Sequence, residues 1–156
     1  MRVLDDVPIT DAVTLFSDSL CYLTDFEDVV SVFEAVYDHL EEGGIFLFDV
    51  HSLYQMQEVF PGYQYHFVED DFAFLWQSYE LDEPGSVEHV IDMYIKQEDG
   101  NLYEHFQEVH EEQTFPIEMY EAALEMVGFT NIKVKADFGQ SEVQETSPRW
   151  FFQAVK

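Results

Sequence analysis

Residues 38–52, DHLEEGGIFLFDVHS, decide how this chain is read. The stretch has the pattern of a helix end, a turn at Gly43 and Gly44, a buried strand, and polar residues where the strand stops. Glycine just after a helix is typical of a left-handed C-cap. A short, continuously apolar run is typical of a strand that is buried on both faces. The stretch therefore predicts half of a parallel α/β unit.

The preceding residues supply the rest of that unit. Residues 11–17, DAVTLFS, are a second apolar run of strand length. Residues 25–41 carry apolar side chains at helical spacing, and Thr24 with Glu27 has the pattern of a capping box. Strand, helix and strand in this order predict a parallel crossover unit.

The middle of the chain follows a different pattern. Residues 63–113 are rich in aromatic and β-branched side chains and are interrupted by the turn sequences DEPGS and EDGN. This pattern predicts an antiparallel sheet of about four strands. Pro116 then opens a helix that Gly128 closes, and two further strands, NIKVKAD and RWFFQAVK, complete the chain.

The length of 156 residues fits one domain. Residues 1–52 and 114–156 form its α/β part, and residues 60–113 form an antiparallel insertion. Cys21 is the single cysteine, which excludes an internal disulfide and fits a reducing cytosol. The sequence has no secretion signal and no apolar run of about 18 residues, so we expect a cytoplasmic protein.

The charge of the chain is extreme. Six Lys and Arg residues stand against 33 Asp and Glu residues, which gives a formal net charge of −27. Such a surface repels phosphate backbones and anionic lipid headgroups, so we expect neither nucleic acid nor membrane as a partner. It favours a cationic or neutral small molecule, or a basic protein. The alternative is a solvated acidic surface without a specific partner.

The ordered set of segments resembles a known family. DAVTLFSDSLCYLTDFEDVVSVFEAVYDHLEEGGIFLFDVHS is similar to the second half of class I S-adenosylmethionine-dependent methyltransferases. The likeness is to the bacterial small-molecule type, with D-S-L-N-Y-L after the fourth strand and L-x-x-G-G-x-F-I-F-D into the fifth. EMVGFTNIKV and RWFFQAVK resemble the end of that fold. The resemblance implies a partial Rossmann-like methyltransferase sheet, equivalent to strands 4–7, with an inserted antiparallel β-sheet as substrate lid. It also implies S-adenosylmethionine as cofactor.

The glycine-rich cofactor signature of that family, D/E-x-G-x-G-x-G, is absent from this sequence. Gly43 and Gly44 follow a helix rather than a strand and do not replace it. We therefore expect a C-terminal portion, either a truncated product or a start assigned to an internal Met. In the family's strand order, 3-2-1-4-5-7-6, the fourth strand would then be an uncovered edge. We expect a homo-oligomer, or a complementing chain, to pair with that edge.

The loop after the first predicted strand holds the cofactor candidates Asp18, Ser19 and Tyr22. Open α/β sheets bind ligands beyond the carboxyl ends of their strands. By the resemblance, this loop lies beside the methyl-donor end of the cofactor; the alternative is a loop whose Asp and Ser cap a turn. Cys21 stands where relatives have Asn, and we expect a buried structural thiol.

Asp49 and His51 end the next strand on the same rim, and they are the catalytic candidates. A carboxylate or an imidazole there can orient an amine or hydroxyl nucleophile, or accept its proton. The alternative is polar termination of a strand, with Ser52 as a helix N-cap.

Two sets of residues in the predicted antiparallel sheet are substrate candidates. The segment YEHFQEVHEEQ has one face with Glu104, Glu108, His110 and Glu112, and another with Tyr103, His105 and Gln107. Glu and His can bind a metal in principle. However, no second ligand cluster has a recognisable spacing and methyl transfer needs no metal, so we expect a solvated face and no metal site. If this face lines a substrate pocket, Glu108 and His110 are the candidates.

Aromatic residues of the same sheet suggest a second kind of substrate contact. Trp76, Tyr79, Tyr94 and Tyr103 could form a cage for a cationic group, with Trp76 and Tyr94 as the candidates. The alternative is ordinary cross-strand packing. We expect Arg149 to be an ion-pair partner.

The sequence leaves two functions open. The first is methyl transfer from S-adenosylmethionine to a small molecule by in-line displacement, through positioning and desolvation with help from Asp49 or His51. The second is a non-catalytic remnant of the methyltransferase fold that acts as an acidic interaction or dimerisation module.

Overall fold

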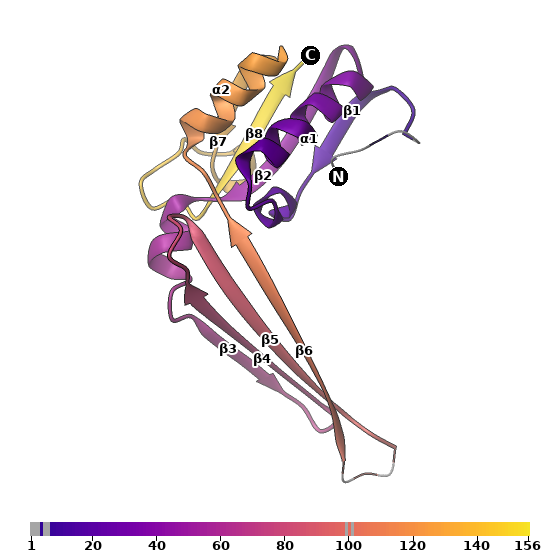
Figure 1. Cartoon of the computed structure of the whole chain (residues 1–156), viewed down its shortest axis with the longest axis vertical. Helices are drawn as coiled ribbons and strands as arrows, with labels where there is room; N and C mark the ends of the chain where they lie inside the picture. Colours follow the sequence, from indigo (N-terminus) through magenta and orange to yellow (C-terminus); the bar gives the residue numbers. More distant parts are fainter. Residues whose placement is uncertain (1–3, 5–6, 99, 101) are drawn as a thin grey trace.

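The computed structural model describes residues 4, 7–98, 100 and 102–156. Their strands form two separate four-stranded sheets, with the orders β1-β2-β8-β7 and β3-β4-β5-β6. We call the first sheet and its helices the body, and the second sheet the arm. Figure 1 shows that the arm is a long sheet that projects from one end of the body.

Each sheet has its own direction of pairing. The body contains β1 (Thr10–Leu15), α1 (Phe26–His39), β2 (Leu40–His51), α2 (Ile117–Val127), β7 (Thr130–Lys135) and β8 (Arg149–Val155). The arm contains β3 (Gln64–Val68), β4 (Phe72–Glu80), β5 (Ser86–Lys96) and β6 (Tyr103–Gln113). β1 and β2 are parallel, β8 is antiparallel to β2 and β7, and all arm strands are antiparallel. The predicted crossover unit and antiparallel sheet are therefore confirmed.

Short helices connect these elements. Two 3-10 turns span Ser19–Tyr22 and Asp137–Gly139, and a π-helical turn at Gln55–Val59 links body and arm. None of the helices in the described ranges is long and apolar enough to cross a lipid bilayer.

The start of α1 differs from the expected capping box. Asp25, rather than Thr24, is the N-cap, and its side chain accepts a hydrogen bond from the backbone N–H of Glu27 at 2.9 Å. Asp at this position satisfies a backbone donor that has no partner inside the helix. The prediction of a Thr24 cap was therefore wrong by one residue.

The end of α1 also differs from the prediction. The helix ends at His39, and Leu40 continues in extended conformation with 1% exposure, so burial of Leu40 turns the chain into β2. Gly43 has φ +81° but lies within β2, near the place where the β1–β2 register shifts. It serves the strand rather than the helix. Gly128, with φ +119°, does close α2 as predicted.

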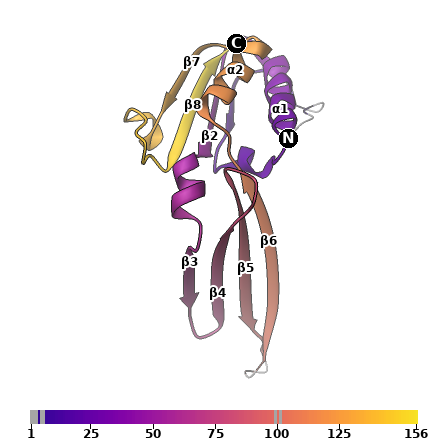
Figure 2. The same ribbon diagram turned by 60° about the vertical axis from the view of Figure 1, so that its left-hand side comes forward.

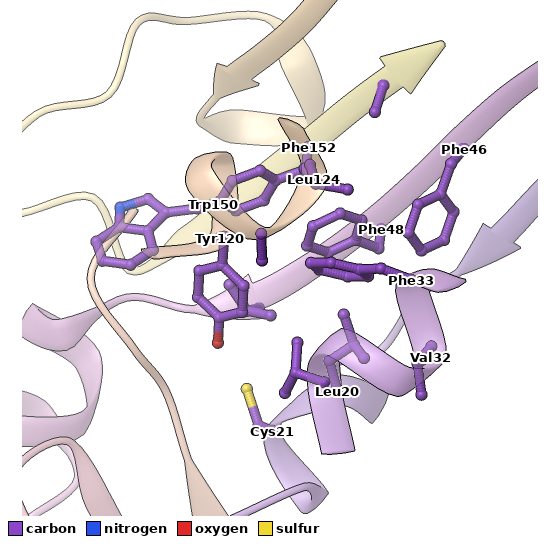
Figure 3. Close-up of a cluster of buried hydrophobic side chains, with 14 of the residues drawn as sticks. Leu20, Cys21, Val32, Phe33, Phe46, Phe48, Tyr120, Leu124, Trp150 and Phe152 are labelled. Carbon is purple, nitrogen blue, oxygen red and sulfur yellow. The ribbon is translucent and has the colours of Figure 1, made fainter. Parts of the chain in front are cut away.

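The core of the body lies between the helices and one face of the sheet. Both helices cover the same face, as the two ribbon views show (Figure 2). Phe48 of β2 stacks on Phe152 of β8 with ring centroids 4.5 Å apart, and Phe33 of α1 packs against Phe48 at 5.3 Å. Leu124 and Tyr120 of α2 close the cluster from the other side (Figure 3). This apolar burial fixes where the strands of the body end.

The opposite face of the body sheet is open. Among the described residues no α-helix lies over it, and it holds a hollow of about 860 Å³ that the 3-10 turn Asp137–Gly139 borders. The hollow is lined by Leu47, Phe151 and Lys133, and it reaches Ser17 and Asp49 at the end nearer the arm.

Candidate functional site

A cavity of about 300 Å³ lies where the carboxyl ends of β1 and β2 meet the base of the arm. The loop after β1, the end of β2 and the inner ends of β4, β5 and β6 all contribute to it. Its lining combines charged and aromatic side chains: Asp18, Tyr22, His51, Phe60, Phe74, Trp76, His89, Ile91, His110, Glu112 and Arg149.

A strained turn positions Asp18. Ser17 and Asp18 both adopt left-handed backbone conformations, with φ of +61° and +50°. Consecutive non-glycine residues in this region are costly and are found where surrounding contacts hold them. Here the backbone N–H of Asp18 donates to Oδ1 of Asp49 at 3.4 Å. The turn thereby brings the Asp18 carboxylate over the end of β2.

Arg149 joins two carboxylates at this end of the sheet. Its Nη2 lies 2.8 Å from Oδ1 of Asp18, and its Nη1 donates to Oδ2 of Asp49. Arg149 is thus the ion-pair partner that the sequence predicted. Burial opposes ionisation of Asp18, but the hydrogen bond and charge of His51 and the charge of Arg149 hold its pKa below the ordinary value.

His51 lies between two acidic side chains. Its Nε2 is 3.4 Å from Oδ2 of Asp18 and 3.9 Å from Oε2 of Glu112. The hydroxyl of Thr114 donates to the carbonyl oxygen of His51 at 2.7 Å, which ties the end of β2 to the base of the arm. His51 therefore sits at the hinge between the two sheets.

Glu112 reaches this site from the arm. It is only 4% exposed, and its Oε2 has no hydrogen-bond partner among the described residues. Burial raises its pKa, opposed by the charge of His51. His89 lies beside it, with Nε2 at 4.0 Å from Oε1 of Glu112 and Nδ1 at 2.7 Å from the hydroxyl of Ser78. Burial lowers the pKa of His89 to about 4, so its ring is neutral near pH 7.

The structure brings together part of the predicted set. Besides Asp18 and His51, the cavity is lined by Tyr22, Trp76 and His110, and Tyr22 packs edge-on to His110 with centroids 5.7 Å apart. Asp49 lies just behind the site, 2% exposed, and its two oxygens face Arg149 and the Asp18 N–H. Its contacts are those of a positioning residue.

Besides Asp49, three predicted residues lie outside the cavity lining. The Ser19 hydroxyl donates to the carbonyl oxygen of Phe16 at 2.7 Å, which is a contact within its own turn. Glu108 lies on the expected face but farther along the arm, 3.2 Å from Nε2 of His110. Tyr94 lies on the other face of the arm, stacked on His105 at 4.5 Å.

The aromatic cage is therefore not formed. In the register of the arm, Trp76 pairs with Ile91, whereas Tyr79 pairs with Glu88 and Tyr94 with Ala73. Side chains of directly paired residues share a face and alternate along each strand, so Trp76 and the three tyrosines point to opposite sides. Phe60 and Phe74 complete the aromatic wall beside Trp76.

Cys21 agrees with its prediction from the sequence, whereas the part that Glu112 plays in the site was not predicted. Cys21 is fully buried and burial raises its pKa, in agreement with the prediction of a structural thiol. The sequence pattern puts Glu112 on the correct strand face, but the predicted substrate contacts on that face are Glu108 and His110 rather than Glu112. Glu112 could have been recognised because it is the last inward-facing residue of β6 before the chain returns to the body.

The sequence of the chain is similar to those of known proteins. The chain matches no protein-family model. It is 37% identical over 156 residues to a protein of Geobacillus sp. (strain WCH70), and 40% identical over 146 residues to YqeM of Bacillus subtilis (strain 168). Both are provisionally described as methyltransferases. These matches cover 100% and 94% of the chain and 63% and 58% of the relatives, so the chain spans about three-fifths of their length.

A solved structure shares the fold of this chain. An S-adenosylmethionine-dependent methyltransferase from Clostridium acetobutylicum ATCC 824 matches 99% of the chain with a TM-score of 0.85 and 26% identity, over 61% of its own length. The fold of the described residues is that of class I S-adenosylmethionine-dependent methyltransferases. Its body order β1-β2-β8-β7 corresponds to strands 4-5-7-6 of the family sheet, and the arm is the inserted antiparallel sheet, as predicted. The family's cofactor is S-adenosylmethionine.

Proposed function

We propose that this chain forms the acceptor-binding part of an S-adenosylmethionine-dependent methyltransferase that acts on a small amine. The observation that carries the proposal is the cavity of about 300 Å³, which joins acidic and aromatic walls at the carboxyl ends of β1 and β2. Cavities of this size, at this edge of an α/β sheet, are typical of small-molecule sites.

The charge of the site supports an amine acceptor. Arg149 pairs with the carboxylates of Asp18 and Asp49, and a third carboxylate, that of Glu112, lies on the other side of His51. The aromatic wall beside them attracts cations through the faces of its rings. A nitrogen that becomes positively charged as it is methylated is stabilised by this arrangement.

The residues present fit the methyl-donor end of the cofactor. Asp18 and Tyr22 stand at the rim where the bound sulfonium would supply an electrophilic methyl group. The amine nitrogen would receive that methyl group, with S-adenosylhomocysteine as the leaving product. His51 is placed to take the proton that the nitrogen loses, while Asp49 and Arg149 hold Asp18 in place. Positioning supplies most of the rate.

The test begins with calorimetric titration of the chain with S-adenosylmethionine and S-adenosylhomocysteine. Saturable binding should be followed by a methylation screen of small amines. For a methylated amine, His51→Gln should lower kcat/KM by about 10²–10⁴-fold, as for loss of a general base. Glu108→Gln, on the arm and outside the cavity lining, is the control and should change kcat/KM less than about twofold. Equal effects of the two variants would contradict the assignment of His51.

One observation favours the second candidate function, a non-catalytic acidic interaction or dimerisation module. None of the strands in the described residues is followed by a D/E-x-G-x-G-x-G turn. If a chain shown to be folded by circular dichroism binds neither form of the cofactor, this chain alone does not catalyse methyl transfer, which supports the second function.

We also propose that the chain associates through β1, either with a second copy or with a complementing chain. β1 is an edge strand that pairs with β2 on one side, within the part of the chain that the structure describes. Edge strands offer free backbone groups to another chain. Thr14→Pro would remove one backbone donor, and sedimentation should then show less dimer. Unchanged dimer in that variant would place the interface elsewhere.

A further inference from the structure

We infer that Asp18, His51 and Glu112 form a binding site for a divalent transition-metal cation such as zinc, and that this cation links the arm to the body. The three residues come from the loop after β1, the end of β2 and the inner end of β6. They are far apart in the sequence, and only the docking of the arm against the body places them together.

The spacing of the ligand atoms fits a shared cation, because the direct contact of His51 with Asp18 is long and its contact with Glu112 is longer still. Nε2 of His51 lies 3.4 Å from Oδ2 of Asp18 and 3.9 Å from Oε2 of Glu112. Both distances exceed the 2.7–3.2 Å of a good N–H···O bond, roughly. Ligands of one tetrahedral zinc ion, with bonds of about 2.1 Å, lie about 3.4 Å apart. The three residues bring one ligand atom each within 4.8 Å of one another, so a small rotation of Glu112 would complete the site.

The state of Glu112 is a second and independent observation. Its side chain is 5% exposed, its Oε2 makes no hydrogen bond within normal distance and angle limits among the described residues, and the Tyr22 hydroxyl is a side-chain donor near its carboxylate. That oxygen is directed toward Nε2 of His51. A buried carboxylate oxygen without a partner is unfavourable, because it has lost its water without replacement. A cation between Glu112 and His51 would satisfy it.

The charges around the site leave room for a dication. Arg149 contacts Oδ1 of Asp18 and pairs with Asp49, so Oδ2 of Asp18 remains directed toward His51. With His51 neutral, as a metal ligand must be, three ionised carboxylates against one guanidinium leave two negative charges uncompensated. One nitrogen and two oxygen ligands suit zinc and neighbouring first-row metals. Three protein ligands leave a fourth position open toward the cavity.

This inference shares His51 with the proposed methyl transfer but does not need that function to be correct. Metal binding is measured without a methyl donor or an acceptor. If the chain is a methyltransferase, bound zinc would occupy Nε2 of His51 and should inhibit the reaction. An inactive chain that binds zinc would sustain this inference and overturn only the proposed function.

The test is calorimetric titration of the chain with Zn²⁺ in the presence of excess Mg²⁺, which occupies the diffuse acidic surface. One zinc site per chain is expected. Asp18→Asn, His51→Gln and Glu112→Gln should each weaken it by at least about 100-fold, more than the loss of an outer-shell partner costs. Glu108→Gln is the control, since it removes a carboxylate from the same strand beside His110. Cobalt should give visible absorption bands at one equivalent that are lost in the same three variants.

Two results would overturn the inference. One is a set of equivalent weak sites that the three substitutions do not change. The other is equal weakening by Glu108→Gln, which would indicate binding to the acidic surface in general. Circular dichroism establishes that each variant is folded. Should Glu112→Gln fail to fold, Asp18→Asn decides the question, because Asp18 lies in a loop and is less buried than Glu112.

Discussion

The body and the arm bury their apolar side chains very differently. In the body, Phe33, Phe46 and Phe48 are completely buried between helices and sheet. On the arm, Phe67 and Phe106 lie on one face of a single sheet, and they are 44% and 42% exposed. Both regions are rich in aromatic residues, but only the body has a second layer to cover them.

The two regions also differ in where they bury polar groups. The buried polar residues of the arm gather at its base: Ser78, Ser86, His89 and Glu112. Farther along the arm, Asp92 and Glu108 are more exposed. The candidate site therefore occupies the part of the arm that the body shields from water, and the rest of the arm is expected to open locally at lower free energy.

The largest expected difference between body and arm is in how much the loss of one phenylalanine ring lowers the free energy of unfolding. Phe48→Ala should lower it by about 3–5 kcal/mol, because the ring stacks on Phe152 and its removal leaves a cavity. Phe67→Ala, the matched change on the arm, should lower it by about 0.5 kcal/mol or less. Urea denaturation of both variants measures the difference. Similar losses would show that the arm has a covered apolar face.

A smaller effect is expected where the loop after β1 is fixed to the sheet. Arg149→Gln leaves the buried Asp49 carboxylate without its cation, and should cost roughly 2 kcal/mol, less than for a fully buried pair because Arg149 is partly exposed. Thermal denaturation measures it. The double variant Asp49→Asn with Arg149→Gln should recover part of the loss. No recovery would mean that Arg149 stabilises the body by packing rather than by charge.

The smallest effect is expected on the outer arm. His105 and Gln107 donate to Oδ1 of Asp92 at 2.6 and 2.9 Å, and these bonds lower the pKa of that carboxyl. A depressed folded pKa gives stability that is present above the unfolded value, about 3.9, and is lost as the pH falls through the folded value. Asp92→Asn should cost about 0.5 kcal/mol or less at pH 7, and nothing measurable near pH 2. A constant loss at both pH values would contradict this account.

The same contrast explains how much of the fold was visible in the sequence. Helical periodicity predicted α1, and Gly128 predicted the end of α2, because both depend on residues close in the chain. The cap at Thr24 was predicted wrongly because the adjacent Asp25 is an equally good capping residue. The role of Gly43 was predicted wrongly because the chain becomes extended at the buried Leu40.

The candidate site was visible only in part, for a related reason. Asp18 and His51 could be predicted because strand ends of a parallel unit share one edge. The face occupied by Tyr94 depends on the register between β4 and β5, which spacing along one strand does not give. Glu112 lies 61 residues after His51 in the sequence, and the two meet only because the arm docks against the body. No local sequence pattern predicts that docking.

The left-handed turn at Ser17 and Asp18 lowers the thermal stability of the chain but fixes the orientation of the Asp18 carboxylate. Glycine adopts this conformation without the steric penalty that serine incurs, so Ser17→Gly should raise the melting temperature of the chain. The same change would free the loop that directs the Asp18 carboxylate toward His51, and Asp18 would then sample more orientations. In a variant of this protein selected for stability at high temperature, we therefore expect a substitution at this turn before any change in the core. The orientation of the Asp18 carboxylate would then be less well defined.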